Sequence, residues 1–192
     1  MNDWLADVVA AAAPAGTETQ RSVVNLVTAP GVDTEGAGYG RLVRFEQPVE
    51  VRRLLHYLAR GLGPYVPGST RPRPFLVARP RPETAEMVSS VAMCAGSGWS
   101  TIGGCDADVY LTGETQHHNA LEAAARGRWV ITTFHSNSER YFLQTRLVEQ
   151  LSGLLRRSVP DAEVLASERD RDPFDVILVG DEELPDLRQL RA

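Results

Sequence analysis

Apolar and polar residues follow two different periods along this chain, and the clearest of them is helical. Between Val51 and Leu62, apolar residues recur three and four positions apart, which predicts an amphipathic helix over this range. A shorter stripe with the same spacing predicts a first helix over residues 3–13, with Asn2 as its N-cap.

Continuous apolar runs in the second half of the chain predict buried strands with helices between them. The strands cover residues 88–94, 108–112 and 129–134, and helices are predicted over residues 114–126 and 139–157. This alternation is typical of βαβ units with parallel strands. We therefore expect an α/β domain with a mixed sheet flanked by helices in a three-layer-like arrangement.

Shorter segments add to the predicted sheet. Short strands are predicted over residues 22–27, 42–45, 75–78, 163–166 and 175–179. Residues 22–27 belong to an ambiguous stretch, for which an edge strand is one interpretation. Gln47-Pro48 is expected to end the strand predicted over residues 42–45. Several prolines and four arginines flank the strand predicted over residues 75–78, and they predict a solvated loop around it. The alternative is that the arginines bind an acidic partner. They are Arg71, Arg73, Arg79 and Arg81.

Composition narrows the class of protein. The 192 residues are 43% hydrophobic and 23% charged, which is ordinary for one globular domain. A formal net charge of −5 makes nucleic acid an unlikely main partner. Two cysteines give no disulfide framework and indicate a reducing compartment. Without a basic leader or an apolar run of about 18 residues, we expect no membrane partner and a cytoplasmic location, with the nucleus or mitochondria as alternatives.

The stretch from Trp129 to Gln144 offers candidate metal ligands. A predicted strand ends at Phe134, and His135 and Glu139 follow it four positions apart. On a first helical turn this spacing brings both side chains to one side. An imidazole and a carboxylate suit zinc, manganese or iron. The alternative is that Glu139 is a capping-box acid and His135 a surface loop residue.

A glycine-rich turn follows the predicted strand 88–94. Gly96 and Gly98 would let backbone N–H groups approach an anion, although the turn matches neither a P-loop nor a dinucleotide fingerprint. Ser97 lacks the flanking glycines of a nucleophile elbow. His117 and His118 are expected in the first turn of the helix 114–126, where adjacent residues face different directions and do not chelate one ion.

Six motifs occur in one order and together resemble the Nif-three-like family, whose bacterial members are often labelled type 2 GTP cyclohydrolase I. They are Gly38-Tyr39-Gly40-Arg41, the turn Cys94 to Gly98, Asp108 to Glu114, His117-His118, His135 to Arg140, and Asp170 to Pro173. The spellings HSNSER and DRDP resemble the eukaryotic branch. The resemblance covers about residues 36–179, and residues 2–5 resemble the segment that joins the two halves of the family's fold.

The resemblance implies two similar α/β halves, assembled as toroidal hexamers, with a pair of divalent metals in a cleft between the halves. It implies that His135 and Glu139 are metal ligands, and it places other residues in the same cleft: Ser97, Glu114, His117, His118 and the anion turn at Gly96 and Gly98. The family's other ligands, a histidine pair and an aspartate, belong to the N-terminal half. The present chain resembles the C-terminal half, so we expect a partial metal site of doubtful occupancy.

This comparison also predicts an organisation and two functions. Residues 1–35 are expected to be a helix and linker, residues 36–180 the α/β domain, and residues 181–192 a flexible tail. The first function is a metal-dependent hydrolase-like protein, weakly catalytic or not catalytic as this chain. The second is a non-catalytic interaction or assembly module, a homo-oligomer or a binder of another protein, linked to transcriptional regulation. No residues indicate a guanine pocket.

Overall fold

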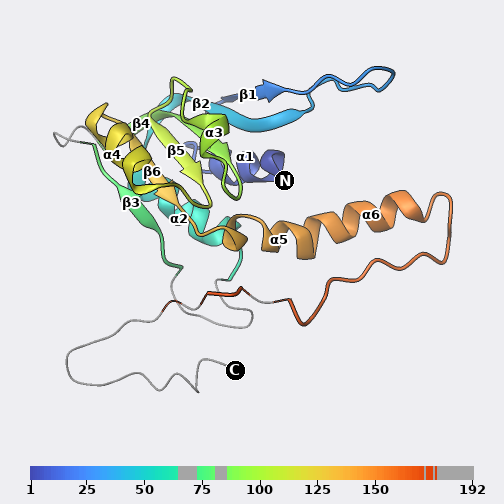
Figure 1. Ribbon diagram of the computed structural model, residues 1–192. Helices are drawn as coiled ribbons and strands as arrows, with labels where there is room; N and C mark the ends of the chain where they lie inside the picture. The colour runs from blue at the N-terminus through green and yellow to red at the C-terminus, as the bar shows by residue number, and fades with distance from the viewer. Residues whose placement is uncertain (65–72, 81–85, 171, 175, 177–192) are drawn as a thin grey trace, which may run out of the picture.

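A computed structural model of the chain describes residues 1–64, 73–80, 86–170, 172–174 and 176. Six strands form one mixed sheet in the order β1-β2-β4-β5-β6-β3 (Figure 1). The strands are β1 (Thr19–Leu26), β2 (Gly38–Glu50), β3 (Leu76–Ala78), β4 (Met87–Cys94), β5 (Val109–Thr112) and β6 (Trp129–Thr132). The helices that cover the sheet are α1 (Asn2–Ala10), α2 (Val51–Gly61), α3 (Trp99–Ile102) and α4 (His117–Ala125).

Three parallel strands form the centre of the sheet. β4 pairs with β5, and β5 with β6, all in the parallel sense, while α3 and α4 provide the connections between them. β1, β2 and β3 join by antiparallel pairing. The predicted βαβ pattern and mixed sheet are confirmed. Because parallel strands share one carboxyl edge, the segments after β4, β5 and β6 come together there.

The two faces of the sheet carry separate cores, as a three-layer arrangement requires. On one face, Leu5 of α1 and Leu54 of α2 pack with Val91 and Leu111 of the sheet. On the other face, Ile102 of α3 and residues of α4 pack with strand residues that alternate with the first set. Before position 36, α1 belongs to the first core, and β1 is attached to the sheet by its pairing with β2.

Several predicted boundaries change in the structure. β2 continues past Gln47-Pro48 to Glu50, because a register shift between Arg44 and Val49 accommodates the proline in the strand. The strand predicted over residues 163–166 is wrong: this segment is irregular, and Leu165 is 82% exposed. The prediction rested on apolar composition alone, and in the described part of the chain this segment has no neighbouring strand with which to form hydrogen bonds. The predicted strand 175–179 and tail 181–192 lie almost wholly outside the described residues.

The long helix predicted from Glu139 is present and runs without a gap from Arg140 to Leu155, with a π-helical turn inside it. A 3-10 turn, η1 (Ser136–Ser138), precedes α5 (Arg140–Phe142), which runs through a π-helical turn, η2 (Leu143–Leu147), into α6 (Val148–Leu155). Figure 1 shows this series extending away from the sheet, as the distal part of the β1–β2 hairpin also does. No helix within the described residues has the length and apolar character to cross a membrane.

Two polar side chains have other roles than predicted. Asn2 does not cap α1; it lies inside the helix, and its Oδ1 accepts a hydrogen bond from the backbone N–H of Ala95 at 3.0 Å. Arg73 is half-buried rather than solvated, and it donates to the carbonyls of Leu62 and Gly63 after α2. Arg79 is exposed beside the short edge strand β3, as predicted, while Arg71 and Arg81 lie outside the described residues.

Candidate metal centre at the carboxyl edge of the sheet

His135 is held between two carboxylates. Its Nδ1 lies 2.8 Å from Glu114 Oε1, and its Nε2 lies 3.8 Å from Glu139 Oε2. A carboxylate only accepts hydrogen bonds, so Nδ1 carries the proton in the shorter contact. In the neutral ring this leaves the Nε2 lone pair directed to the Glu139 side. The spacing of four residues therefore has the predicted effect, although η1 and the residues flanking it, rather than an α-helical turn, produce it.

The surroundings of His135 are acidic. The hydrogen bond with Glu114 raises the pKa of His135, and the negative charges of Glu139, Glu114 and Asp172 act in the same direction, against a smaller effect of burial. The His135 side chain is 46% exposed and Glu139 is 26% exposed. An accessible imidazole with carboxylates on both sides attracts cations.

The residues present fit two ligand positions of a divalent ion. Ligand atoms about 2.0–2.2 Å from a tetrahedral zinc lie about 3.3 Å from each other. The 3.8 Å between His135 Nε2 and Glu139 Oε2 is within a small side-chain adjustment of that value. In the part of the chain that the structure describes, no three His, Cys, Asp or Glu side chains form a potential metal cluster.

Gly96 makes room for these two side chains. A Cβ atom at this position would lie 2.6 Å from Glu139 Oε1 and 3.1 Å from His135 Nε2, and the backbone φ of +64° also favours glycine. The glycine-rich turn therefore faces the metal candidates directly. Its predicted role as an anion cradle stays a prediction, whereas its close approach to the His135 and Glu139 side chains is a property of the fold.

The last residue of β5, Thr112, and the two residues after it connect the neighbouring segments. Thr112 Oγ1 donates to the carbonyl of Gly96 and accepts from the N–H of Gly98, at 3.0 and 3.1 Å. Gly113 leaves space, because a Cβ there would lie 2.7 Å from the Gly96 carbonyl oxygen. The Glu114 N–H donates to that same carbonyl oxygen at 3.1 Å. The Thr-Gly-Glu sequence thus binds the turn after β4 through the Thr112 hydroxyl and the Glu114 N–H, and it binds His135 through the Glu114 carboxylate.

The backbone has an unusual conformation just before His135. Phe134 has a φ of +66°, which is unusual for a residue with a Cβ and costs about 1–2 kcal/mol. After this residue, η1 begins and Arg140 starts α5.

Arg140 Nε donates to Asp170 Oδ2 at 2.7 Å, and its Nη1 lies 3.6 Å from Asp172. This pairing ties the predicted charged turn to the start of α5, on the side of the His135 site.

Three more side chains that were predicted to line the cleft are exposed: Ser97, His117 and His118. Ser97 lies in the glycine-rich turn with its side chain exposed, and His117 and His118 lie in the first turn of α4. Among the described residues, neither histidine forms a hydrogen bond or an ion pair with Glu114, His135 or Glu139. Their predicted roles in substrate binding remain predictions.

The chain resembles proteins of one family over most of its length. A model of the Duf34/NIF3 (NGG1p interacting factor 3) family matches residues 1–173. Protein NIF3 homolog of Schizosaccharomyces pombe is 35% identical over 175 residues, covering 91% of this chain and 58% of that protein. NGG1-interacting factor 3 of Saccharomyces cerevisiae is 33% identical over 179 residues, covering 92% of this chain and 56% of that protein. The chain therefore spans a little over half the length of these relatives.

A solved structure shares the fold. A hypothetical protein of Staphylococcus aureus matches with a TM-score of 0.63 and 19% identity, covering 92% of this chain and 63% of that one. At this identity the similarity concerns the fold alone. Both yeast relatives agree with the eukaryotic character of the motifs.

Proposed function

The chain belongs to the Duf34/NIF3 (NGG1p interacting factor 3) family, and from this premise we propose that the carboxyl edge of its sheet is part of a divalent-metal site. His135, through Nε2, and Glu139 are the protein ligands in this proposal. The observation that carries it is the 3.8 Å between their donor atoms, beside a glycine that leaves the space open. Zinc, manganese and iron suit this pair of donors.

Each neighbouring residue has a definite part in the proposed site. Glu114 holds the Nδ1 proton of His135 and so keeps Nε2 available. Gly96 brings the backbone of the β4 turn against both ligands. A bound ion would act as a Lewis acid and would lower the pKa of a bound water.

We propose weak metal binding and little or no catalysis by this chain alone, because catalytic zinc sites normally have three protein ligands. The chain spans just over half of its fungal relatives, and its motifs resemble the C-terminal half of the family's fold. The remaining ligands would come from the other half of such a protein. A hydrolase-like reaction is accordingly a proposal for the completed site.

Metal binding in three variants tests this proposal. Zinc and manganese affinity is measured by competition with a coloured chelator, using the wild-type chain, His135→Ala, Glu139→Gln and the control His56→Ala. His56 is an exposed histidine of α2 that takes no part in the site. We expect weak one-ion binding that the first two substitutions abolish and the control preserves. Equal binding by wild type and His135→Ala would refute the site.

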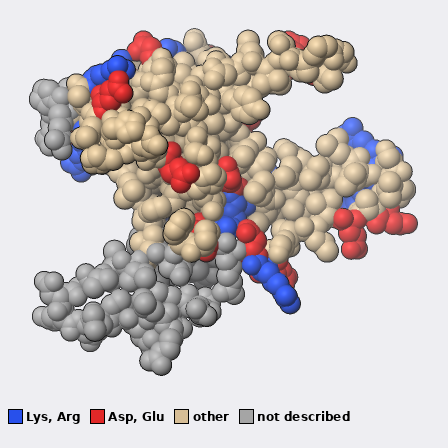
Figure 2. All heavy atoms as spheres, in the orientation of Figure 1, with Lys and Arg blue, Asp and Glu red and all other residues tan. Residues whose placement is uncertain are grey.

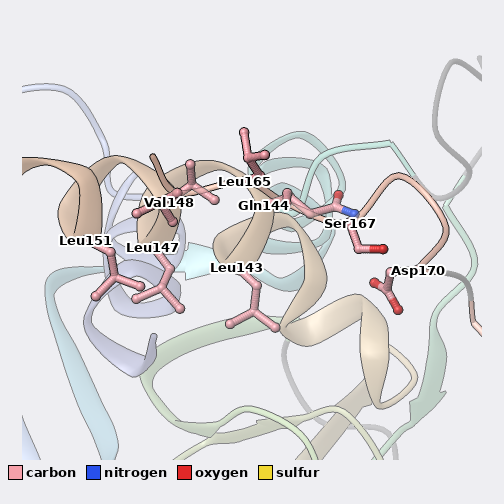
Figure 3. Close-up of a pocket in the computed structure, with 10 residues that line it drawn as sticks. Leu143, Gln144, Leu147, Val148, Leu151, Leu165, Ser167 and Asp170 are labelled. Atoms are coloured by element: carbon pink, nitrogen blue, oxygen red, sulfur yellow. The ribbon is translucent and has the colours of Figure 1, made fainter. Parts of the chain in front are cut away.

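A second candidate, self-assembly, is favoured by the apolar surface of α5 to α6. α6 has no buried residue, and its leucine side chains are exposed: Leu154 by 57% and Leu155 by 45%. Figure 3 shows Leu143, Leu147 and Leu151 directed to one side of the helix. Together with residues 164–167 and Asp170, they are among the residues that line a pocket of about 290 Å³. On the face seen in Figure 2, the projecting helix has mainly uncharged surface, with charged side chains toward its far end.

We propose a second copy of the chain as the partner of this helical surface, since self-complementary twofold contacts are the commonest way to bury such a stripe. Analytical ultracentrifugation should show a concentration-dependent oligomer. Leu151→Lys should dissociate it, while Gln150→Lys, a neighbouring exposed polar position, should not. A wild-type monomer at all concentrations would refute this candidate. The link to transcriptional regulation remains a prediction from the family resemblance.

A further inference from the structure

We propose that Ser138 is a positioning residue for the metal candidates, and that its buried hydroxyl sets the distance between the glycine-rich turn and the His135–Glu139 pair. This inference rests on the proposed metal site and names a residue that determines its affinity. Ser138 is not itself a proposed ligand, so it acts only through its neighbours.

The hydroxyl of Ser138 joins two segments that are far apart in the sequence. Its Oγ accepts a hydrogen bond from the Gly96 N–H at 2.7 Å and donates one to the His135 carbonyl at 2.7 Å. The side chain is almost completely buried, with 1% of the residue exposed. The hydrogen bond from Gly96 is therefore shielded from competing water, and the bond to the His135 carbonyl is partly shielded.

The connection fixes the geometry of the candidate ligands. The α-carbon of Gly96 faces Glu139 Oε1 and His135 Nε2. A shift of Gly96 therefore changes the space that these two side chains have beside the turn. The other bond holds the backbone of His135 itself. A single hydroxyl thus sets the distance between the turn after β4 and the loop after β6, across the end of β5.

Gly113 makes this connection possible. A Cβ at Gly113 would lie 2.9 Å from Ser138 Oγ, inside normal contact distance. The absence of a side chain lets the hydroxyl reach past β5 to Gly96. Residues that orient a metal ligand through hydrogen bonds typically change metal affinity on the order of 10- to 100-fold when removed.

Ser90 provides a matched control at the opposite edge of the sheet. It is also buried, at 3% exposure, and its Oγ accepts from the Asp108 N–H at 3.0 Å and donates to the Asp108 carboxylate at 2.9 Å. It therefore joins β4 to the segment before β5 in the same way. Ser138→Ala and Ser90→Ala each remove one buried hydroxyl, but only the first touches the metal candidates.

The test compares zinc affinity and the His135 ring in wild type, Ser138→Ala and Ser90→Ala. Affinity is measured by chelator competition on folded protein, and the metal-free ring is followed by nitrogen-15 NMR. We expect Ser138→Ala to weaken zinc binding by about tenfold or more and to broaden or shift the His135 ring signals. Ser90→Ala should leave both unchanged. Equal affinities in the two variants would overturn the role of Ser138 and leave the metal site standing.

Failure of the metal site gives a different result. If neither wild type nor His135→Ala binds zinc, the proposed function fails, and the ring signals alone decide on Ser138. Unchanged ring signals in Ser138→Ala would then overturn the positioning role as well.

Hydrogen exchange in the wild type provides a measurement that does not depend on the folding of a variant. Coupling between sites is reciprocal, so an ion held by the positioned ligands must also stabilise the hydrogen bond from Gly96 to Ser138. Zinc should slow exchange of the Gly96 amide more than that of Asp108, whose N–H is bound to Ser90. Equal slowing of the two amides would contradict the proposal.

Discussion

Arg41 and Asp3 form a two-pronged ion pair that joins β2 to α1. Arg41 Nε lies 2.6 Å from Asp3 Oδ1, and Nη2 lies 2.7 Å from Oδ2. The arginine side chain is 7% exposed, whereas the aspartate is 60% exposed. The third guanidinium nitrogen of Arg41, Nη1, donates to the carbonyls of Gly38 and Gly40. A buried guanidinium is thus satisfied by its own strand and by one carboxylate of the first helix.

Asp3→Asn should lower the free energy of unfolding, because it leaves the buried charge of Arg41 without its carboxylate. We expect a loss of about 1–3 kcal/mol, toward the lower end since water reaches Asp3. Urea unfolding followed by circular dichroism measures it. The control is Asp7→Asn, which breaks the more exposed pair with Arg21 and should cost less than about 1 kcal/mol. Equal losses would contradict the importance of Arg41 burial.

The same pair predicts a dependence of stability on pH. The hydrogen bond from Arg41 holds the pKa of Asp3 below its usual value. The stabilisation is therefore fully present above the pKa of an unfolded aspartate, about 3.9, and is lost as the pH falls through the lower pKa of the folded state. The difference in urea midpoint between wild type and Asp3→Asn should be constant from about pH 7 to about pH 5 and should shrink below about pH 4. A difference that stays constant through strongly acidic pH would contradict this.

Two glycine-to-alanine substitutions should change the stability of the protein in opposite directions. Gly113→Ala places a Cβ against the Gly96 carbonyl oxygen and Ser138 Oγ, and overpacking of this kind costs about 1–3 kcal/mol. Gly153 lies within α6, and a Cβ added there would meet no other atom within 4 Å. Gly153→Ala should therefore stabilise the helix by about 0.5–1 kcal/mol. Thermal unfolding measures both, and a stabilising Gly113→Ala would show that the turn is not packed as described.

The periodic parts of the fold could be predicted because burial imposes the pattern. α2 follows its apolar stripe closely, and β4, β5 and β6 follow their continuous apolar runs, since both faces of the sheet are covered. Residues 163–166 carry a similar composition without becoming a strand. A strand needs a neighbour with free hydrogen-bonding groups, and local composition does not report that neighbour.

The candidate site could be predicted only where its residues have distinctive chemistry. His135 and Glu139 stood out by type and spacing, whereas the residue types of Asn2 and Ser138 did not indicate their contacts. Their actual partners, Ala95 and Gly96, are distant in the sequence, and only the folded sheet brings them together. The sequence Thr112-Gly113-Glu114 offered a signal, since a glycine between two polar residues at a strand end indicates close backbone approach.

Removal of the Glu114 carboxylate should weaken metal binding without unfolding the protein. Glu114 is exposed, and its carboxylate contacts His135 Nδ1. Glu114→Ala frees the imidazole to rotate and to place its proton on Nε2, so zinc affinity should fall on the order of 10- to 100-fold. Chelator competition measures the affinity, and NMR reports the tautomer. The control Glu122→Ala removes an exposed carboxylate paired with Arg126 on α4 and should leave zinc binding unchanged. If both variants lost affinity equally, overall negative charge rather than orientation of His135 would govern binding.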